Sequence, residues 1–366
     1  MSAGTPRARG PRASRVRRRE REHRRRSIEL MVTGLVVALG LVYASTQVDG
    51  PASAAGDGGG SSSPSAGRPP ALLALSVNGA PKPLLAVVGA AGDPPAAMGV
   101  PQGLTLEVPG AGDLTTRRVA ALPGDAVQVA LSNVVGAWAA HYAVTDLAHL
   151  ATLVDRNDGL RLEMPEAVTL EGEVLGPGLV RMSGAQVAAF LGAEHQNTFT
   201  RWEVVLAGFL ASPPELEQGD LVETDDIAGV QATLDGAKGG RIETLPVQVA
   251  AATVRVPKYG ALDELMAERF GVKRTPVPVI VQNAVGTAGV GEAVGRLIIG
   301  RGFRVTLSQN AVTFDKDVTQ IVALGEEHLA DARRVRAAMG VGRIAVSQVA
   351  SGIGDVQIIV GKDFTA

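Results

Sequence analysis

One arginine near the middle of the chain has the residue type and the setting of an anion ligand. Arg201 lies in the stretch AAFLGAEHQNTFTRWEVVLAGFL, where a polar loop precedes an apolar, helix-forming segment. A guanidinium group forms charge-assisted and often bidentate bonds with phosphate or carboxylate, so Arg201 could hold the phosphate of a ligand. Alternatively, it is a charge at the start of a helix that pairs with Glu203 or Glu194. Arg181, in LVRMSG, could line the same cleft or point into solvent.

Other residue types with catalytic potential are not arranged for chemistry. The histidines do not cluster with Asp or Glu at metal-ligand spacing, which favours structural roles for His141, His149, His195 and His328. The loop GTAGVG (286–291) lacks the glycine spacing and the later acidic residue of a dinucleotide site, so tight packing explains its glycines better. The pair Asp225-Asp226 is more simply a turn or a helix start than a cation site. We therefore expect no cofactor and no metal.

The charge distribution divides the chain into two unequal parts. The whole protein has 366 residues with 35 basic and 37 acidic side chains, but eleven arginines lie between Met1 and Arg26, beside only Glu20 and Glu22. The remainder therefore carries a formal charge of −11. Arginine outnumbers lysine 29 to 6, a bias of GC-rich coding sequences that suggests an actinobacterial source. The two parts face different environments.

An apolar segment directly follows the basic tail (residues 1–27). Residues 28–46 are almost free of charge and are just long enough for one membrane span. The preceding arginines place the N-terminus in the cytoplasm and the rest of the chain outside the cell. A cleaved signal peptide is the alternative for the span, and nucleic-acid binding is the weaker one for the arginines. Residues 47–70 are rich in Gly, Ser, Ala and Pro, which predicts a disordered tether.

Two globular regions follow the tether. In residues 71–272, alternating strand and helix patterns include a hairpin turn at Asn78-Gly79 and a helix capped by Ser183. A helix with Trp138 on its apolar side is also expected, from AVQVALSNVVGAWAAHY. Residues 277–366 predict the order β-α-β-β-α-β-β, a compact α/β domain. The chain has no cysteine, so both regions depend on their cores and not on disulfides.

The last ninety residues resemble the C-terminal domain often found on LytR-CpsA-Psr proteins. The motifs VIVQNAVGTAGVGEAVGRLIIGRGFRV, TQIVALGEEHLADARRVRAAMGV and DVQIIVGKDF carry this resemblance through nearly the whole domain. Residues 71–272 resemble the family's catalytic domain in a degenerate form, on AHYAVTDLAHLATLVDRNDGLRLEMP, LGPGLVRMSGAQVAAFLG and FTRWEVVLAGFLA. The fold implied is a membrane-anchored α/β sandwich followed by a small α/β domain.

The resemblance also implies a chemistry, most of whose residues are absent. Catalytic members transfer a phosphorylated glycopolymer from a polyprenyl-pyrophosphate carrier to peptidoglycan, with arginines holding the pyrophosphate and aspartates helping to hold a divalent metal. Their Pro-Arg-Asp motif has no counterpart beside Asp93, and FLGAEHQ lacks their arginine pair. In NTFTRWE only Arg201 matches. Loss of one such donor commonly lowers the rate by about 10²–10³.

Three hypotheses follow. The preferred one is a single-pass, extracytoplasmic protein without transferase activity, which binds a cell-wall glycopolymer, a polyprenyl-linked lipid or active LytR-CpsA-Psr relatives, and no nucleic acid. The second is a divergent phosphotransferase that uses Arg201, Arg181 and either Arg117 or Arg118 with Mg²⁺. The third is an adaptor whose C-terminal domain does the recognising.

Overall fold

The computed structural model describes residues 71–80, 82–170, 172–193, 198–251 and 254–365. The predicted basic tail (1–27), membrane span (28–46) and tether (47–70) lie outside these residues and remain predictions. Among the helices in the described ranges, none has the length and apolar character needed to cross a bilayer.

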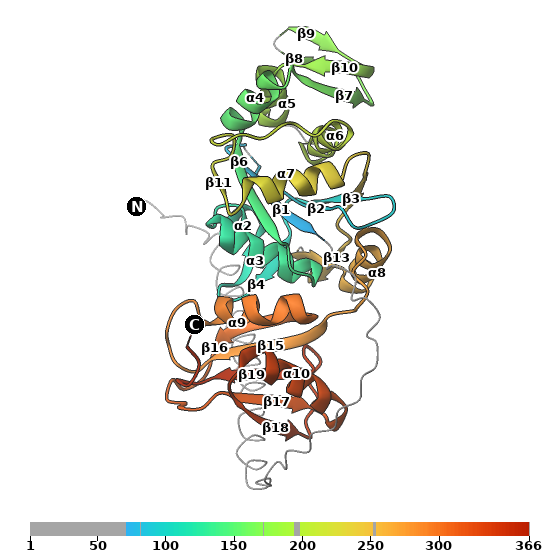
Figure 1. Ribbon diagram of the computed structural model, residues 1–366. Coiled ribbons are helices and arrows are strands. Elements are labelled where there is room, and N and C mark those ends of the chain that lie inside the picture. Colours follow the sequence, from blue (N-terminus) through green and yellow to red (C-terminus); the bar gives the residue numbers. More distant parts are fainter. Residues whose placement is uncertain (1–70, 81, 171, 194–197, 252–253, 366) are drawn as a thin grey trace, which may run out of the picture.

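A mixed six-stranded sheet forms the centre of the first globular region (Figure 1). Its order is β11 (Glu223–Thr224), β6 (His141–Asp146), β1 (Leu72–Asn78), β2 (Leu84–Gly89), β3 (Ala96–Val100) and β12 (Arg241–Thr244). Strands β1 and β2 pair antiparallel, so the hairpin expected at Asn78-Gly79 is confirmed. β1 pairs parallel with β6 on its other side. Gly79 has a φ of 77°, which the turn requires.

Helices cover both faces of this sheet, which makes the region an α/β sandwich. Alternate residues of β1 point to opposite faces, so Leu73 and Val77 join one core while Leu72 and Ala74 join the other. The first core is completed by α4 (Leu147–Arg156), α5 (Gly184–Gly192), α6 (Thr198–Ala211) and α7 (Ile227–Gly236). The second is completed by α2 (Thr116–Val119), α3 (Gly124–Val135), α8 (Tyr259–Phe270), β4 (Thr105–Val108) and β13 (Val247–Ala251). β4 pairs with β5 (Gly112–Thr115), and β13 pairs with β14 (Val254–Pro257).

Two helices that follow β6 begin at capping residues that the sequence shows. The side chain of Asp146 accepts hydrogen bonds from the Ala148 and His149 amides and caps α4. Ser183 caps α5 in a reciprocal capping box with Gln186. Between these helices the chain forms an antiparallel hairpin of β7 (Leu160–Met164) and β10 (Gly178–Met182). A smaller hairpin, β8 (Val168–Leu170) and β9 (Glu173–Leu175), lies at the tip of the molecule (Figure 1).

Two local expectations were wrong or incomplete. The helix expected to carry Trp138 ends earlier, because Gly136 adopts a left-handed conformation with a φ of 68° and terminates α3. Trp138 instead lies beside Gly300 of the C-terminal domain. Helix α7 is not evident from periodicity, yet Asp226 caps its start, as the helix-start interpretation of Asp225-Asp226 predicts.

The C-terminal domain has the predicted β-α-β-β-α-β-β order. Its five-stranded sheet runs β16 (Phe303–Asn310), β15 (Val277–Asn283), β19 (Val356–Val360), β17 (Gln320–Leu324) and β18 (Arg343–Ser347). Helices α9 (Val290–Ile298) and α10 (Leu329–Met339) pack on the same face of the sheet, in one core. Short 3₁₀ turns, Ile299–Arg301 and Glu326–His328, adjoin these helices.

The edge strand β16 is docked against the first region by buried hydrogen bonds. Asn133, fully buried on α3, accepts from the Val305 amide at 2.8 Å and donates to the Val305 carbonyl at 2.9 Å, and so imitates a neighbouring strand. The Arg304 guanidinium binds Asp263 at 2.6 Å and stacks on the Tyr259 ring. A side chain at Gly291 would come within 2.7 Å of Gly110, so the glycines of GTAGVG allow close packing. The two regions therefore form one continuous structure.

A buried carboxyl group lies at this junction. Glu107 on β4 accepts a 2.7 Å hydrogen bond from the Ser308 amide and is 8% exposed. Burial raises the pKa of Glu107 to about 8, assisted by the charge and hydrogen bond of Asp113 and opposed by the bond from Ser308. Glu107 is therefore largely protonated at neutral pH.

Candidate functional site

Arg201 contacts the preceding helix. It lies in the first turn of α6, half-buried, and its Nη1 donates a 3.0 Å hydrogen bond to the Phe190 carbonyl of α5. The guanidinium carbon also lies 4.9 Å from the centre of the Phe190 ring, a cation–π contact. Burial lowers the pKa of Arg201, and the charge of Glu166 acts in the opposite direction. The alternative pairing with Glu203 is not formed; Glu203 accepts a hydrogen bond from Thr244. Glu194 lies outside the described residues.

Arg181 is located on the wall of a cleft that does not include Arg201. The cleft has a volume of about 1110 Å³ and lies between the β7/β10 hairpin, α6, the turn after α6 and strand β12. This volume is slightly above the range of about 300–1,000 Å³ that is typical of small-molecule and cofactor sites. Arg161, which sequence analysis missed, lies directly opposite Arg181 in the antiparallel register and lines the same cleft. The structure therefore brings together Arg181 and Arg161, and it leaves Arg201 apart.

The two cleft arginines form no ion pair with any residue that the structure describes. Both side chains are exposed, and within the described ranges neither forms an ion pair or a side-chain hydrogen bond. Like charges directly opposite one another across two strands destabilise a sheet by roughly 0.2–1 kcal/mol. The stem of Arg181 lies against Gly159, where a β-carbon would come within 3.4 Å of it. The pair can hold a phosphate or carboxylate between its guanidinium groups.

The rest of the cleft combines hydrogen-bond acceptors with apolar surface. Asp158, Glu163 and Glu203 supply carboxylates, which can accept bonds from ligand hydroxyls. Leu179 and Val204 supply apolar surface, and Leu179 is 70% exposed. An arginine pair, carboxylates and an apolar wall suit an anionic ligand that also bears hydroxyl groups and C–H faces, as a phosphorylated sugar does.

One glycine sets the distance between α6 and the wall that carries Arg161. At Gly208, where α6 crosses β7, a β-carbon would lie 2.5 Å from Leu162 Cδ2 and 2.9 Å from the Arg161 carbonyl. Real β-carbons essentially never approach so closely, so a larger residue would displace β7. The position of Arg161 therefore depends on this glycine.

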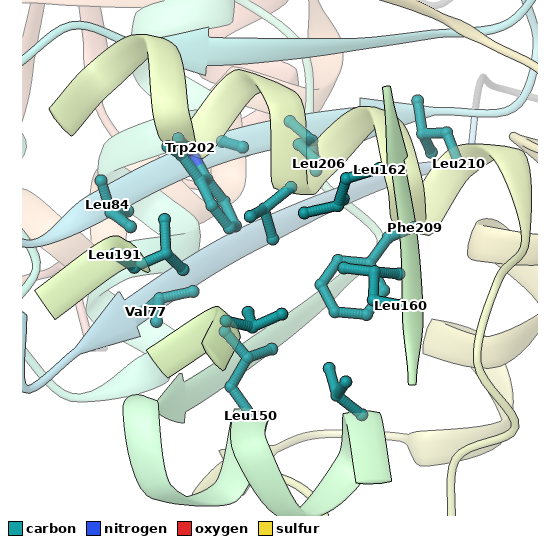
Figure 2. Packing of buried hydrophobic residues seen from close by; sticks show 14 of the residues in the cluster. Val77, Leu84, Leu150, Leu160, Leu162, Leu191, Trp202, Leu206, Phe209 and Leu210 are labelled. Carbon is teal, nitrogen blue, oxygen red and sulfur yellow. The ribbon is translucent and has the colours of Figure 1, made fainter. Parts of the chain in front are cut away.

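The interior between the sheet and helices α4, α5 and α6 is filled by side chains (Figure 2). Trp202 of α6 is 1% exposed and packs among residues from the sheet, the helices and β7. Figure 2 labels other members of this cluster: Val77, Leu84, Leu150, Leu160, Leu162, Leu191, Leu206, Phe209 and Leu210. The indole Nε1–H of Trp202 has no hydrogen-bond partner among the described residues. Apolar side chains therefore fill the interior around Trp202.

The three described candidate histidines each lie beside a carboxylate. His141 lies 3.3 Å from Asp225, and His149 lies 2.9 Å from the capping carboxylate of Asp146. His328 lies 3.6 Å from Asp355. Across the described portion of the chain, no group of three or more His, Cys, Asp or Glu side chains is placed to hold a metal ion. His195 lies outside that portion.

The comparisons with known proteins bear on the two regions differently. Residues 276–364 match the family model of the LytR cell envelope-related transcriptional attenuator. The chain therefore carries a LytR C-terminal domain. This match confirms the predicted resemblance of that domain and its link to the cell envelope. No curated protein sequence matches the chain.

Several solved structures are similar to the chain. TagV from Bacillus subtilis has 12% identity and a TM-score of 0.45, over 54% of this chain and 94% of TagV. A LytR-Csp2A-Psr enzyme from Actinomyces oris has 17% identity and a TM-score of 0.42, over 56% and 90% of the two chains. The family protein YwtF (TagT) with bound octaprenyl pyrophosphate lipid has 12% identity and a TM-score of 0.43, over 56% and 92%.

Proposed function

We propose that this protein is a membrane-anchored, extracytoplasmic cell-envelope protein that binds an anionic wall glycopolymer or its lipid-linked form without transferring it. The LytR C-terminal domain supports the cell-envelope setting. The arginine-rich tail followed by an apolar segment supports the anchor and its orientation. The motif order of residues 71–272 supports descent from the LytR-CpsA-Psr catalytic domain.

The arginine pair in the cleft is the observation that carries the binding function. Arg161 and Arg181 face one another on the wall of a large cleft, and neither is paired with a carboxylate of the described residues. A phosphate placed between them would relieve their mutual repulsion and form charge-assisted hydrogen bonds. The carboxylates of Glu163 and Asp158 would accept bonds from sugar hydroxyls in the same cleft.

The setting of Arg201 supports the absence of transferase activity. Its guanidinium is already engaged by the Phe190 carbonyl and ring. Stabilising a pyrophosphate leaving group requires several fixed donors aimed at one point, and Arg181 is located in a different place. The packed interior around Trp202 supports binding of the polar part of the ligand in the cleft in preference to its isoprenoid tail.

The test is a binding measurement combined with a product measurement. Full-length protein in detergent is titrated with a soluble poly(glycerol phosphate) chain, and phosphate release from polyprenyl pyrophosphate is followed with Mg²⁺ present. We expect binding without release. The double variant Arg161→Ala/Arg181→Ala should weaken binding by about 10- to 100-fold, as expected for loss of two charge-assisted contacts.

A matched variant controls for loss of net charge. Lys273→Ala/Arg274→Ala removes the same two positive charges from an exposed segment outside the cleft and should bind normally. Phosphate release that Arg201→Ala abolishes would favour the divergent phosphotransferase. Equal binding by all variants would show that the cleft is not the binding site.

A further inference from the structure

The two edges of the C-terminal sheet have different environments. Strand β16 forms one edge and is covered by the first globular region through Asn133 and Glu107. Strand β18 forms the other edge, at the opposite end of the molecule from the β8/β9 tip (Figure 1). An unpaired edge strand presents backbone donors and acceptors that can pair with another chain.

The backbone of β18 shows which groups are available. β18 pairs in parallel with β17, and the Arg343 amide donates to the Thr319 carbonyl. Residues of a strand alternate in the direction of their hydrogen bonds, so the N–H and C=O groups of Ile344 and Val346 point away from β17. Two donors and two acceptors are therefore presented at this edge.

Arginines surround the open edge. A shallow groove of about 370 Å³ between α10 and β18 is lined by Arg333, Arg336, Ala337, Gly340 and Ile344. Arg343 is exposed at the start of the strand itself. Among the residues that the structure describes, these three arginines form no ion pair, whereas the neighbouring Arg334 binds Asp331 at 2.8 Å. The edge therefore combines backbone N–H and C=O groups that β17 does not use with arginine charges that no described carboxylate pairs.

We propose that β18 and the arginines of α10 form a docking site for an extended, acidic peptide segment of a partner protein. The segment adds to β18 as a sixth strand, with main-chain hydrogen bonds to Ile344 and Val346. Acidic residues at positions i and i+2 of the added strand lie about 6.7 Å apart on one face. Arg333 and Arg336 are three apart on a helix, with β-carbons about 5–6 Å apart, so they match that spacing.

The experiment uses full-length protein and fluorescently labelled decapeptides of defined sequence. The probe is five repeats of Glu-Thr, which offers acidic side chains on one face and a free backbone. Five repeats of Glu-Pro carry the same charge but have no proline N–H to donate. Five repeats of Gln-Thr keep the backbone and lose the charge. We expect the Glu-Thr peptide to bind at least about tenfold tighter than either control.

Protein variants then locate the site. Arg333→Ala/Arg336→Ala should weaken binding of the Glu-Thr peptide by about tenfold, since two charge-assisted contacts are lost, while Lys273→Ala/Arg274→Ala should not. Equal binding of the Glu-Thr and Glu-Pro peptides would overturn strand addition, and an unaffected Arg333/Arg336 variant would overturn the site. Self-association that this variant abolishes, without binding of the Glu-Thr peptide, would overturn the proposal in favour of a second copy.

Discussion

Arginines occur in opposite situations on the two sides of helix α6. Arg201 is half-buried, hydrogen-bonded to the Phe190 carbonyl and stacked on the Phe190 ring. Arg161 and Arg181 are exposed, lie opposite each other and have no acidic partner in the described structure. The sequence resemblance predicts Arg201 as the arginine that is retained from the family's NTFTRWE-like segment. The comparison teaches that the partners of an arginine, more than its place in a motif, indicate whether it remains available for a ligand.

The largest expected effect is on the free energy of unfolding, and it comes from the core that α6 packs against. Trp202→Ala should lower the free energy of unfolding by about 3–5 kcal/mol, because it removes a fully buried ring from the core beside Arg201. Trp202→Phe should cost less than about 1.5 kcal/mol, since it also removes an indole N–H that has no acceptor among the described residues. Denaturant unfolding measures both. Similar small losses for the two variants would contradict a filled interior.

The second effect is on the pH dependence of stability, through the buried carboxyl group of Glu107. Because its folded pKa of about 8 lies above the ordinary value of 4.5, Glu107 contributes stability that is complete below pH 4.5 and is lost as the pH rises through 8. The free energy of unfolding should fall by on the order of a few kcal/mol over this pH range. Glu107→Gln should flatten this part of the pH profile. Thermal unfolding from pH 5 to pH 9 measures it, and parallel profiles for the two proteins would contradict the buried, protonated carboxyl.

A third change alters the cleft without touching its arginines. Gly208→Ala should destabilise the protein by roughly 1–3 kcal/mol and weaken glycopolymer binding, because β7 and Arg161 must shift. Gly260→Ala is the matched control, since its β-carbon would meet nothing within 4 Å on α8. Calorimetry and the binding assay measure the two effects. Unchanged binding in a stable Gly208→Ala protein would show that glycopolymer binding does not depend on the position of β7 and Arg161.

The smallest effect concerns the cleft pair in the absence of ligand. Replacing Arg161 alone by Ala should leave stability unchanged or raise it by up to about 1 kcal/mol, because a repulsive cross-strand pair is removed. Arg201→Ala should instead lower stability by about 1 kcal/mol, through loss of its bond to Phe190. Denaturant unfolding distinguishes the two signs. A clear loss of stability in Arg161→Ala would contradict the repulsive pair and indicate that Arg161 forms a stabilising ion pair.

Local signals in the sequence predicted much of the fold. Ser183 has a short side chain at a helix start, and the strong periodicity of the C-terminal domain fixed its element order. The position of Trp138 was mispredicted because Gly136 terminates the helix by its backbone conformation, which periodicity does not reveal. Helix α7 has only a weakly apolar face, so only its cap at Asp226 was visible.

The candidate site was less accessible from sequence because it depends on pairing between distant residues. Arg181 could be identified as a cleft candidate, but its partner Arg161 could not, since the antiparallel register of β7 and β10 was unknown. Nor could the sequence show that Arg201 would bond to a carbonyl of the preceding helix. The nearest sequence signal for Arg161 was its place beside Leu160 and Leu162, whose alternation predicts that it points outward.

The most direct test compares the two sides of α6 in one binding assay. Poly(glycerol phosphate) is titrated into wild-type protein, Arg161→Ala/Arg181→Ala and Arg201→Ala at a single salt concentration. We expect affinity to fall by about 10- to 100-fold in the cleft variant and to stay at the wild-type value in Arg201→Ala. Loss of binding in Arg201→Ala with normal binding in the cleft variant would contradict this expectation.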